Sequence, residues 1–276
     1  MNNTYPILDP HAPPSAQRGS SSFCALAMMI KAPRAGQSKT RLVPPLTHGE
    51  AAALSVRFLR DTTENIAGVT LDHQAEGVAV YTPVGAEAAF DGLLPAGFSL
   101  LAQRGESFGD RLFYAAEDLL AVGYESLCLI DSDSPTLPPA LLAQAVAALG
   151  RAGDRVVLGP SDDGGYYLIG IKRAHRRLFT EVEWSTAKVL AQTIERAAEI
   201  DLEVELLPAW YDVDDAATLR ALCAELFSPP PPRAAENQPR RGYPAPHTRS
   251  YLAKLIEGEG RERIWPEACQ SAGVTG

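Results

Sequence analysis

Short apolar runs alternate along most of the chain with longer segments in which apolar residues recur every three or four positions. The short runs predict buried strands, and the longer spacing predicts helices that bury one face. The predicted strands lie at residues 23–31, 77–81, 98–103, 126–130, 155–158, 166–171 and 203–207. The predicted helices lie at residues 47–67, 107–122, 138–150, 185–198 and 214–227. This alternation predicts an α/β fold in which helices cover both faces of a mostly parallel sheet.

Several helix ends carry their own sequence signals. Thr47 followed by Glu50 predicts a capping box at the start of the first helix, and Gly123 suits the position just after the second. A proline near residue 138 suits a helix start. Ser185 is predicted to cap the helix that reaches Ala198.

The elements define one domain over residues 23–227. Residues 1–22 are rich in proline and serine, so we expect a disordered N-terminal segment. Residues 228–276 are predicted to be a Pro-rich linker and a short tail, because eight of the 22 prolines lie from residue 229 onward. Within that tail, residues 248–257 are expected to form one short helix that docks back on the domain.

Composition is that of a globular protein with a sizeable core, since 46% of the 276 residues are hydrophobic. The apolar run from Phe23 to Ile30 is far shorter than the roughly 20 residues that span a bilayer. No basic stretch followed by an apolar core precedes it, so we expect a cytoplasmic protein with no membrane span. The four cysteines form no CxxC pair, and we expect them to be small buried hydrophobes without metal or disulfide.

The formal net charge of -9 is unevenly distributed along the chain. From residue 229 onward there are seven Lys/Arg and five Asp/Glu, so the rest of the chain is more acidic than the whole. An acidic body argues against a groove for nucleic acid, which needs clustered cations. It is compatible with a site that binds phosphates through a metal.

Two carboxylates stand directly after the predicted strand at residues 126–130. Asp131 and Asp133 are followed by Pro135, which stops the strand. Ligands bind outside the carboxyl ends of strands in open α/β sheets, and Mg²⁺ typically takes one or two carboxylates plus phosphate oxygens. Asp133 is the better candidate for a metal ligand, and Asp131 ligates through water or orients the site. Capping of the following turn would explain one of these acids but explains two poorly.

The loop after the first strand is cationic. It contains Lys31, Pro33, Gly36, Lys39 and Arg41, and it lacks the glycines of a Walker A motif. A glycine that lets the backbone approach a ligand, together with several cations, suits the phosphates of a nucleotide. The alternative is a solvated basic loop.

Two further segments place acids near predicted strand ends. In the turn at residues 159–165, Asp163 precedes Gly164 and Gly165, so this carboxylate could accept hydrogen bonds from sugar hydroxyls or act as a base. Because Asp-Gly is also a common hairpin turn, we interpret the turn as structural with Asp163 reaching the ligand. At residues 210–215, helix capping accounts for Asp214 and Asp215 and leaves Asp212 to complete a metal site.

Two weaker candidates remain. Trp184 could form an aromatic wall beside an acceptor, although a hydrophobic staple and an N-cap explain residues 183–186 nearly as well. Arg111 could contact a base or a phosphate, or it could simply belong to the start of a helix. The five histidines show no metal-binding spacing in the sequence.

Together these motifs resemble the nucleotide-diphospho-sugar transferase superfamily with the GT-A fold. More narrowly, the chain resembles a small bacterial family of GT-A-like glycosyltransferases, some of which are linked to arsenosugar biosynthesis. The first motif is also similar to that of 2-phospho-lactate guanylyltransferases. The matching residues are 31–33, 36, 39–42, 131–135, 159–160, 163–170, 184–186 and 211–214. The resemblance spans about residues 23–226 and implies a three-layer α/β/α fold with a mostly parallel mixed sheet. It also implies a nucleotide over the first half of the sheet and a divalent cation at Asp133.

Our leading hypothesis is a glycosyltransferase that depends on Mg²⁺ or Mn²⁺ and transfers a sugar from a nucleotide-diphospho-sugar to a small-molecule acceptor. Lys31, Pro33, Gly36, Lys39, Arg41 and Arg111 would bind the nucleotide. Asp163 and Asp133 would be the catalytic residues, Asp131 and Asp212 would support the metal, and Gly164, Gly165 and Trp184 would contact the substrate.

Two alternatives stay open. The first is a guanylyltransferase-like nucleotidyltransferase that acts on a phosphorylated small acid and releases pyrophosphate from a nucleoside triphosphate. The sequence departs from the sugar-nucleotide pyrophosphorylase pattern, because no glycine-rich run precedes Lys39, and this weakens the case for that class of enzyme. The second is a non-catalytic nucleotide-binding protein that regulates a partner through its proline-rich tail.

Overall fold

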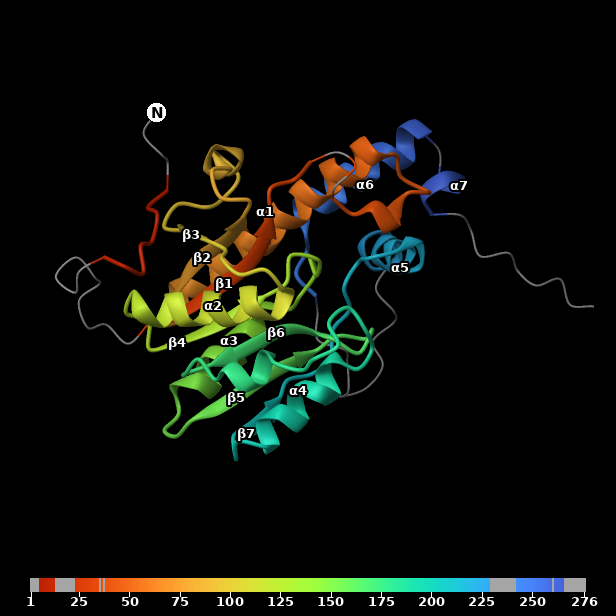
Figure 1. Cartoon of the computed structure of the whole chain (residues 1–276). Coiled ribbons are helices and arrows are strands. Elements are labelled where there is room, and N and C mark those ends of the chain that lie inside the picture. The colour runs from red at the N-terminus through yellow and green to blue at the C-terminus, as the bar shows by residue number, and fades with distance from the viewer. Residues whose placement is uncertain are drawn as a thin grey trace, which may run out of the picture.

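A computed structural model describes residues 5–12, 23–34, 36, 38–228, 242–259 and 261–265. Within these residues the fold is built on one seven-stranded sheet in the order β3-β2-β1-β4-β6-β5-β7 (Figure 1). The strands are β1 (Cys24–Lys31), β2 (Ala75–Thr82), β3 (Ser99–Ala102), β4 (Ser126–Ile130), β5 (Arg155–Pro160), β6 (Tyr166–Ile171) and β7 (Glu203–Leu206). Only β6 pairs antiparallel with its neighbours, so the predicted mostly parallel mixed sheet is confirmed.

Helices cover both faces of the sheet and thereby complete three layers. Helices α1 and α3 pack on one face, whereas α2 and α4 pack on the other. Three more helices, α5, α6 and α7, lie together at one end beside the first half of α1. The helices are α1 (His48–Asp72), α2 (Phe108–Ala121), α3 (Pro139–Gly150), α4 (Val189–Ala198), α5 (Ala216–Phe227), α6 (Pro246–Glu259) and α7 (Arg261–Ile264).

The central strand β1 shows why the sheet is covered twice. Leu26 and Met28 point to the α1 and α3 face, and Ala25 and Ala27 point to the α2 and α4 face. All four are 0% exposed. Successive residues of a strand face opposite sides, so an unbroken apolar run requires a layer of helices on each side.

Most predicted helix signals are confirmed, and one is wrong. The Thr47 hydroxyl accepts from the Glu50 N–H at 3.2 Å, and the Glu50 carboxylate accepts from the Thr47 N–H at 2.7 Å. Gly123 follows α2 with φ 107°. Ser185 does not cap α4, because it adopts φ 63° well before the helix starts at Val189.

The expectation of a disordered segment over residues 1–22 is wrong for residues 5–12. The Leu8 N–H donates to the Leu100 carbonyl at 2.8 Å, and the Leu100 N–H donates to the Pro6 carbonyl at 2.8 Å. The Tyr5 hydroxyl donates to the Leu94 carbonyl at 2.7 Å. Because β3 is an edge strand, its backbone groups need a partner, and a proline-rich composition cannot reveal that this segment supplies it. Residues 1–4 and 13–22 lie outside the described residues.

Helices beyond the predicted domain boundary at residue 227 pack into the hydrophobic core of the domain. Helix α6 is longer than the predicted segment 248–257 and docks on α1, as expected. Leu252 of α6 and Ile264 of α7 are 0% exposed and share a core with Leu54 and Phe58 of α1. The predicted linker falls largely on residues 229–241, which lie outside the described residues.

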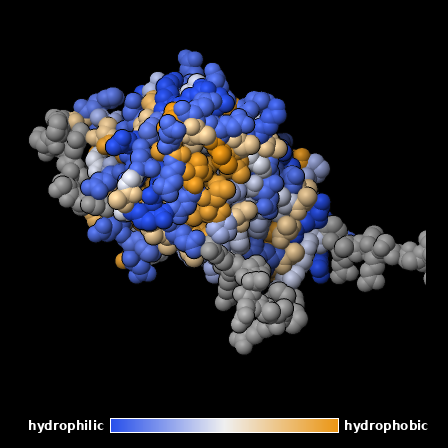
Figure 2. All heavy atoms as spheres, turned by 90° about the horizontal axis from the view of Figure 1, so that it is seen from below, coloured by the Kyte–Doolittle hydropathy of each residue, from blue (hydrophilic) through white to orange (hydrophobic). Residues whose placement is uncertain are grey.

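The surface of the described chain carries a group of hydrophobic side chains, although none of its helices could span a membrane. Every helix that the structure describes is too short or too polar to cross a membrane. Seen from below, the face near the edge strand β7 carries a central group of hydrophobic side chains (Figure 2). Leu206 of β7 is itself 54% exposed.

Strand direction brings four connections to one edge of the sheet. The segments after β1, β4 and β7 start at the carboxyl ends of strands, and the hairpin turn between β5 and β6 lies at the same edge. The turn and the segment after β7 are linked, because the Trp210 N–H donates to the Pro160 carbonyl at 3.0 Å. The predicted site residues on these four connections are therefore brought close together.

Candidate active site

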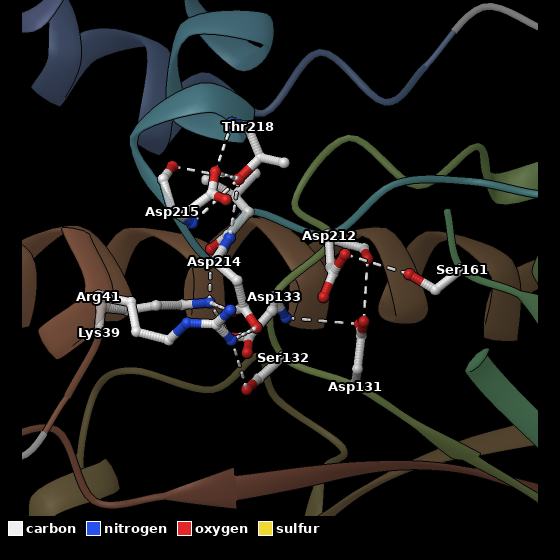
Figure 3. Close-up of polar contacts among 12 residues, drawn as sticks. Lys39, Arg41, Asp131, Ser132, Asp133, Ser161, Asp212, Asp214, Asp215 and Thr218 are labelled. Carbon is white, nitrogen blue, oxygen red and sulfur yellow. Dashed lines mark hydrogen bonds and ion pairs between the residues drawn. The ribbon is translucent and has the colours of Figure 1, made fainter. Parts of the chain in front are cut away.

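The carboxyl edge of the sheet contains a cavity of about 540 Å³, here called the larger cavity. Five aspartates line it, and they come from three connections far apart in the sequence; Figure 3 labels all of them except Asp163. They are Asp131, Asp133, Asp163, Asp212 and Asp214. The predicted convergence of acids from separate strand ends is thus what the structure shows.

Lys39 lies between two of these acids. It has a left-handed backbone with φ 51°, and its side chain is only 7% exposed. Its ammonium lies 2.8 Å from Asp133 and 2.8 Å from Asp214, and it donates to the Val213 carbonyl at 2.7 Å. Burial alone would lower the pKa of Lys39, but the two carboxylates raise it, so this ammonium is held charged.

The other predicted nucleotide-binding residues fall into two groups. Lys31 and Pro33 line a second cavity of about 190 Å³, here called the smaller cavity, together with Lys39 and Asp133. Arg41 lines the larger cavity and lies 3.6 Å from Asp214, with 73% of its side chain exposed. Asp133 lines both cavities, so they meet at this residue.

Gly36 and Arg111 line neither cavity. Gly36 is exposed, with φ 74°. Arg111 donates to the Glu106 carbonyl at 3.1 Å, and its guanidinium lies 5.7 Å from the centre of the Phe108 ring. In this structure Arg111 therefore contacts its own helix start, which was the alternative interpretation of that residue.

Asp131 and Asp212 lie on the other side of Asp133 from Lys39 (Figure 3). Asp131 accepts from the Ser134 hydroxyl at 2.9 Å, and Asp212 accepts from the Ser161 hydroxyl at 3.1 Å. Burial raises the pKa of Asp131 well above its usual range, and repulsion from Asp133 and Asp212 raises it further. Burial and then repulsion from Asp214 and Asp163 raise the pKa of Asp212. Asp131 and Asp212 therefore lie close to other carboxylates, with too little positive charge nearby to balance them.

The turn that carries Asp163 is structural and also points this acid at the cavity. One carboxylate oxygen of Asp163 accepts from the Gly165 N–H at 2.8 Å, which fixes the side chain. Gly164 has φ 90°, and a Cβ on it would come within 2.3 Å of the Ala187 carbonyl oxygen. Gly164 is therefore needed for backbone packing, whereas Gly165 lines the cavity.

Three aromatic side chains that contact one another also line the larger cavity and are here called the aromatic wall. Trp184 packs edge to face on Phe108 with ring centres 5.2 Å apart, and its ring centre lies 6.4 Å from that of Tyr166. All three line the cavity. Trp184 thus lines the cavity with other aromatic side chains, as an aromatic wall requires. The neighbouring Glu183 is exposed and pairs with Lys188.

A partly buried network of polar contacts connects two of the acidic segments. The Thr136 hydroxyl is hydrogen-bonded to Glu225 at 3.1 Å and accepts from the Trp210 indole N–H at 3.3 Å, and Tyr211 is also hydrogen-bonded to Glu225. The Val213 N–H donates to the Asp133 carbonyl at 2.9 Å. These contacts hold the segment after β4 against the segment after β7.

The carboxylates fit a divalent cation that is shared with a ligand. The ligand atoms of Asp131, Asp133 and Asp212 do not all lie within 4.8 Å of one another. Among the described residues, neither Asp133 Oδ2 nor Asp212 Oδ2 has a hydrogen-bond or ion-pair partner. Mg²⁺ is usually held by one or two carboxylates together with substrate phosphates, so a complete protein cage is not required.

One group in the described chain does meet that closer spacing, and it lies elsewhere. Asp61, Glu64 and His247 offer ligand atoms within 4.8 Å of one another at the contact between α1 and α6. Asp61 already accepts from the N–H groups of His247 and Thr248, and His247 pairs with Glu64 at 2.7 Å. Docking of α6 accounts for these contacts. Sequence spacing could not reveal the group, because His247 is more than 180 residues away from Asp61 and Glu64 along the chain.

Sequence reasoning missed Asp214 and Ser161. Asp214 was explained as a helix cap, but Asp215 alone caps α5, through the N–H groups of Ala217 and Thr218. Asp214 turns to Lys39 instead. In an extended segment alternate residues share a side, so the spacing of Asp212 and Asp214 was the signal that could have found it. Ser161 had no comparable signal.

Comparison with known proteins agrees with the fold. A family described as uncharacterized protein conserved in bacteria (DUF2064) matches residues 65–186. That match covers less than half of the chain and includes Asp131, Asp133, Asp163 and Trp184, but neither Lys39 nor Asp212. No curated protein matches the sequence.

Among solved structures, a Desulfovibrio desulfuricans protein with a provisional description as a nucleotide-diphospho-sugar transferase has a TM-score of 0.72 and 27% identity. The similarity covers 86% of this chain and 96% of that one. A cytidylyltransferase from Leptospira borgpetersenii has a TM-score of 0.46 and 10% identity, over 90% of this chain and 99% of that one. A CMP:2-keto-3-deoxy-manno-octonic acid synthetase with CTP has a TM-score of 0.43 and 13% identity, over 73% and 97%. The last two similarities are too weak to carry a conclusion about this chain.

Proposed function

We propose that this protein is a glycosyltransferase that uses a divalent cation and a nucleotide-diphospho-sugar to glycosylate a small molecule. The observation that carries the proposal is the convergence of five aspartates on one cavity at the carboxyl edge of the sheet. The similarity to the Desulfovibrio protein supports transferase chemistry on this fold. The proposal places the nucleotide in the smaller cavity and the sugar and acceptor in the larger one, with the diphosphate near Asp133.

The distribution of cations favours a diphosphate donor over a triphosphate. Lys39 is committed to Asp133 and Asp214, which leaves Lys31 and Arg41 as the other Lys/Arg side chains that line the two cavities among the described residues. A triphosphate carries more negative charge and would need more cations than this loop offers. The same reasoning counts against the guanylyltransferase-like alternative.

Each residue has a separate task in the proposed reaction. Asp133 and Asp212 hold the cation, and the half-buried Asp131 supports the site. When bound, Mg²⁺ or Mn²⁺ supplies positive charge that neutralises the negative charge developing on the leaving diphosphate. Arg41 adds exposed positive charge at the rim of the same cavity.

Asp163 acts on the acceptor. The acceptor oxygen forms a bond to the anomeric carbon while the bond from that carbon to the diphosphate oxygen breaks. The electron pair of the broken bond leaves with the nucleoside diphosphate, and the hydroxyl proton passes to Asp163. The hydrogen bond from the Gly165 N–H at 2.8 Å holds one oxygen of Asp163, so the other is available to the acceptor.

Product analysis tests this proposal directly. The full chain is incubated with Mn²⁺ and each common nucleotide sugar, and separately with each nucleoside triphosphate. We expect release of a nucleoside diphosphate from at least one nucleotide sugar. Release of pyrophosphate from a triphosphate, with no turnover of any nucleotide sugar, would overturn the proposal in favour of nucleotidyl transfer. Nucleotide binding without any turnover would favour a regulatory protein.

A further inference from the structure

The larger cavity has two walls of different chemistry. One is apolar and aromatic, with Phe108, Leu112, Tyr166 and Trp184, and the other consists of the five aspartates. Phe108 is 44% exposed although it is a large hydrophobic residue. At about 540 Å³ the cavity has the size of a typical small-molecule site.

The two walls are held together by backbone contacts. The Leu190 N–H donates to the Gly164 carbonyl at 2.9 Å, which ties the start of α4 to the turn that carries Asp163. Trp184 packs against Gly109, where an added Cβ would lie 2.6 Å from the indole nitrogen. The distance between the aromatic wall and the acidic wall is therefore set by the fold.

The larger cavity is negative without a cation, and it is negative again when a cation and a diphosphate are both bound. Arg41 is the one Lys or Arg among the described residues that line it, against five aspartates. Lys39, Arg41 and a divalent cation together balance at most four of the five. Even with Asp131 protonated, the diphosphate of a donor makes the balance negative again. A further anion would meet like charges on the acidic wall and on the donor.

Resting on the proposed function, we infer that the acceptor is an uncharged or cationic molecule with an aromatic or apolar part. Its ring packs against Trp184 and Phe108, and its polar end lies toward Asp163 and Asp212. The same charge balance excludes a phosphorylated acid, which the guanylyltransferase-like alternative would require.

Three phenols that differ in charge test the inference without any donor. Tyramine is cationic, tyrosol is neutral and 4-hydroxyphenylacetate is anionic, and all three share the 4-hydroxyphenyl ring. Calorimetric titration of the full chain without added metal is expected to show tyramine and tyrosol binding at least tenfold more tightly than the anion. Equal or tighter binding of the anion, or no binding of any phenol, would overturn the inference.

Variants assign the effect to the two walls. Trp184→Leu is expected to weaken tyramine and tyrosol alike, by about tenfold for the loss of an aromatic contact. Asp212→Asn is expected to weaken tyramine alone. Trp265→Leu, in the separate core near Phe227, is the matched control and should change neither. If Trp184→Leu does not fold, Trp184→Phe and the exposed Asp163→Asn provide the same comparison. Retained tyramine binding in both would contradict the inference.

The outcome separates this inference from the proposed function. If the anion is preferred while nucleotide sugars still bind with metal, the acceptor class is wrong and the proposed reaction stands. If the phenols bind in the expected order while no nucleotide sugar binds, the charge of the cavity is confirmed and the proposed donor is wrong.

Discussion

The acidic cluster has two halves that differ in how their charge is balanced. The closed half consists of Lys39, Asp133 and Asp214, where a buried ammonium lies 2.8 Å from each carboxylate. The open half consists of Asp131, Asp163 and Asp212, for which no ion pair occurs in the described chain. In the closed half, the Lys39 ammonium balances negative charge of Asp133 and Asp214. In the open half, three carboxylates lie together without such an ion pair among the described residues, so an added cation would stabilise them.

This difference between the two halves explains why one edge of the sheet can be both stable and reactive. The closed half ties the loop after β1 to the segments after β4 and β7, so it positions Asp133 at the boundary between the two cavities. The open half faces the larger cavity with oxygens that the protein leaves without a cation. Structure-forming and ligand-directed acids therefore lie side by side, and only Asp133 takes part in both roles.

Asp133→Asn is expected to have the largest effect, because it acts on both halves. Metal-dependent binding of a nucleotide sugar should fall by about 100-fold or more, which corresponds to about 3 kcal/mol. Calorimetry with Mn²⁺ measures the loss. Asp162→Asn changes an exposed acid of the neighbouring turn and serves as the control. Unchanged binding in Asp133→Asn would remove this residue from the metal site.

Lys39→Met breaks the closed half. Asp133 and Asp214 would then lose the ammonium between them, which leaves only the exposed Arg41 beside Asp214, and their side chains remain 35% and 36% exposed. We expect the free energy of unfolding to fall by about 2 kcal/mol, less than for a fully buried pair because solvent screens the two carboxylates. Urea unfolding measures it, with the exposed Lys31→Met as control. A variant as stable as the wild type would show that Lys39 is not structural.

The same substitution, made once in each half, distinguishes their roles: Asp212→Asn changes the open half and Asp214→Asn changes the closed half. The raised pKa of Asp212 means that its ionised form destabilises the fold at neutral pH, so Asp212→Asn should be as stable as the wild type or more stable. Asp214→Asn removes a partner of Lys39 and should lose about 1 kcal/mol. Metal-dependent nucleotide binding should show the reverse order, with roughly tenfold loss in Asp212→Asn. Equal effects of both variants would abolish the distinction.

Lowering the pH should raise the stability contribution of the open half and lower that of the contact between α1 and the tail. This is the smallest expected effect. Hydrogen bonds from Arg263, and others from Thr47, lower the pKa of Glu50 from 4.5 to about 2. This contribution to stability is present above pH 4.5 and is lost as the pH falls toward 2.

Arg263→Gln should therefore flatten the loss of stability between pH 4.5 and 2, measured by urea unfolding at several pH values. Asp212→Asn should instead remove a gain in stability on acidification. A pH profile of Arg263→Gln identical to that of the wild type would contradict the assigned contact.

The sheet and its helices could be predicted from the sequence because their signals are local. The bounds of β4 and β6 agree with the predicted ones, since apolar runs and turn residues lie next to each other in the chain. Residues 5–12 and the docking of α6 could not be fully predicted. Their partners, β3 and α1, lie far away in the sequence, and only tertiary packing selects them.

The acids of the site could be predicted as strand-end residues, whereas their pairing could not. Asp131, Asp133, Asp163 and Asp212 lie in one cavity, as strand direction implies. Lys39 was assigned to phosphates because it belongs to a cationic loop. Its ammonium donates to the carbonyl of Val213, which lies 174 residues later in the chain. Sequence spacing carries no information on that contact.

The most direct test of the central claim is a calorimetric titration of the full chain with nucleoside diphosphates, in the presence and absence of Mn²⁺. If the open half binds a cation together with a diphosphate, at least one nucleoside diphosphate should bind tenfold or more tightly with Mn²⁺, and Asp212→Asn should abolish that difference. Binding that is the same with and without Mn²⁺, or a metal effect that persists in Asp212→Asn, would contradict the account.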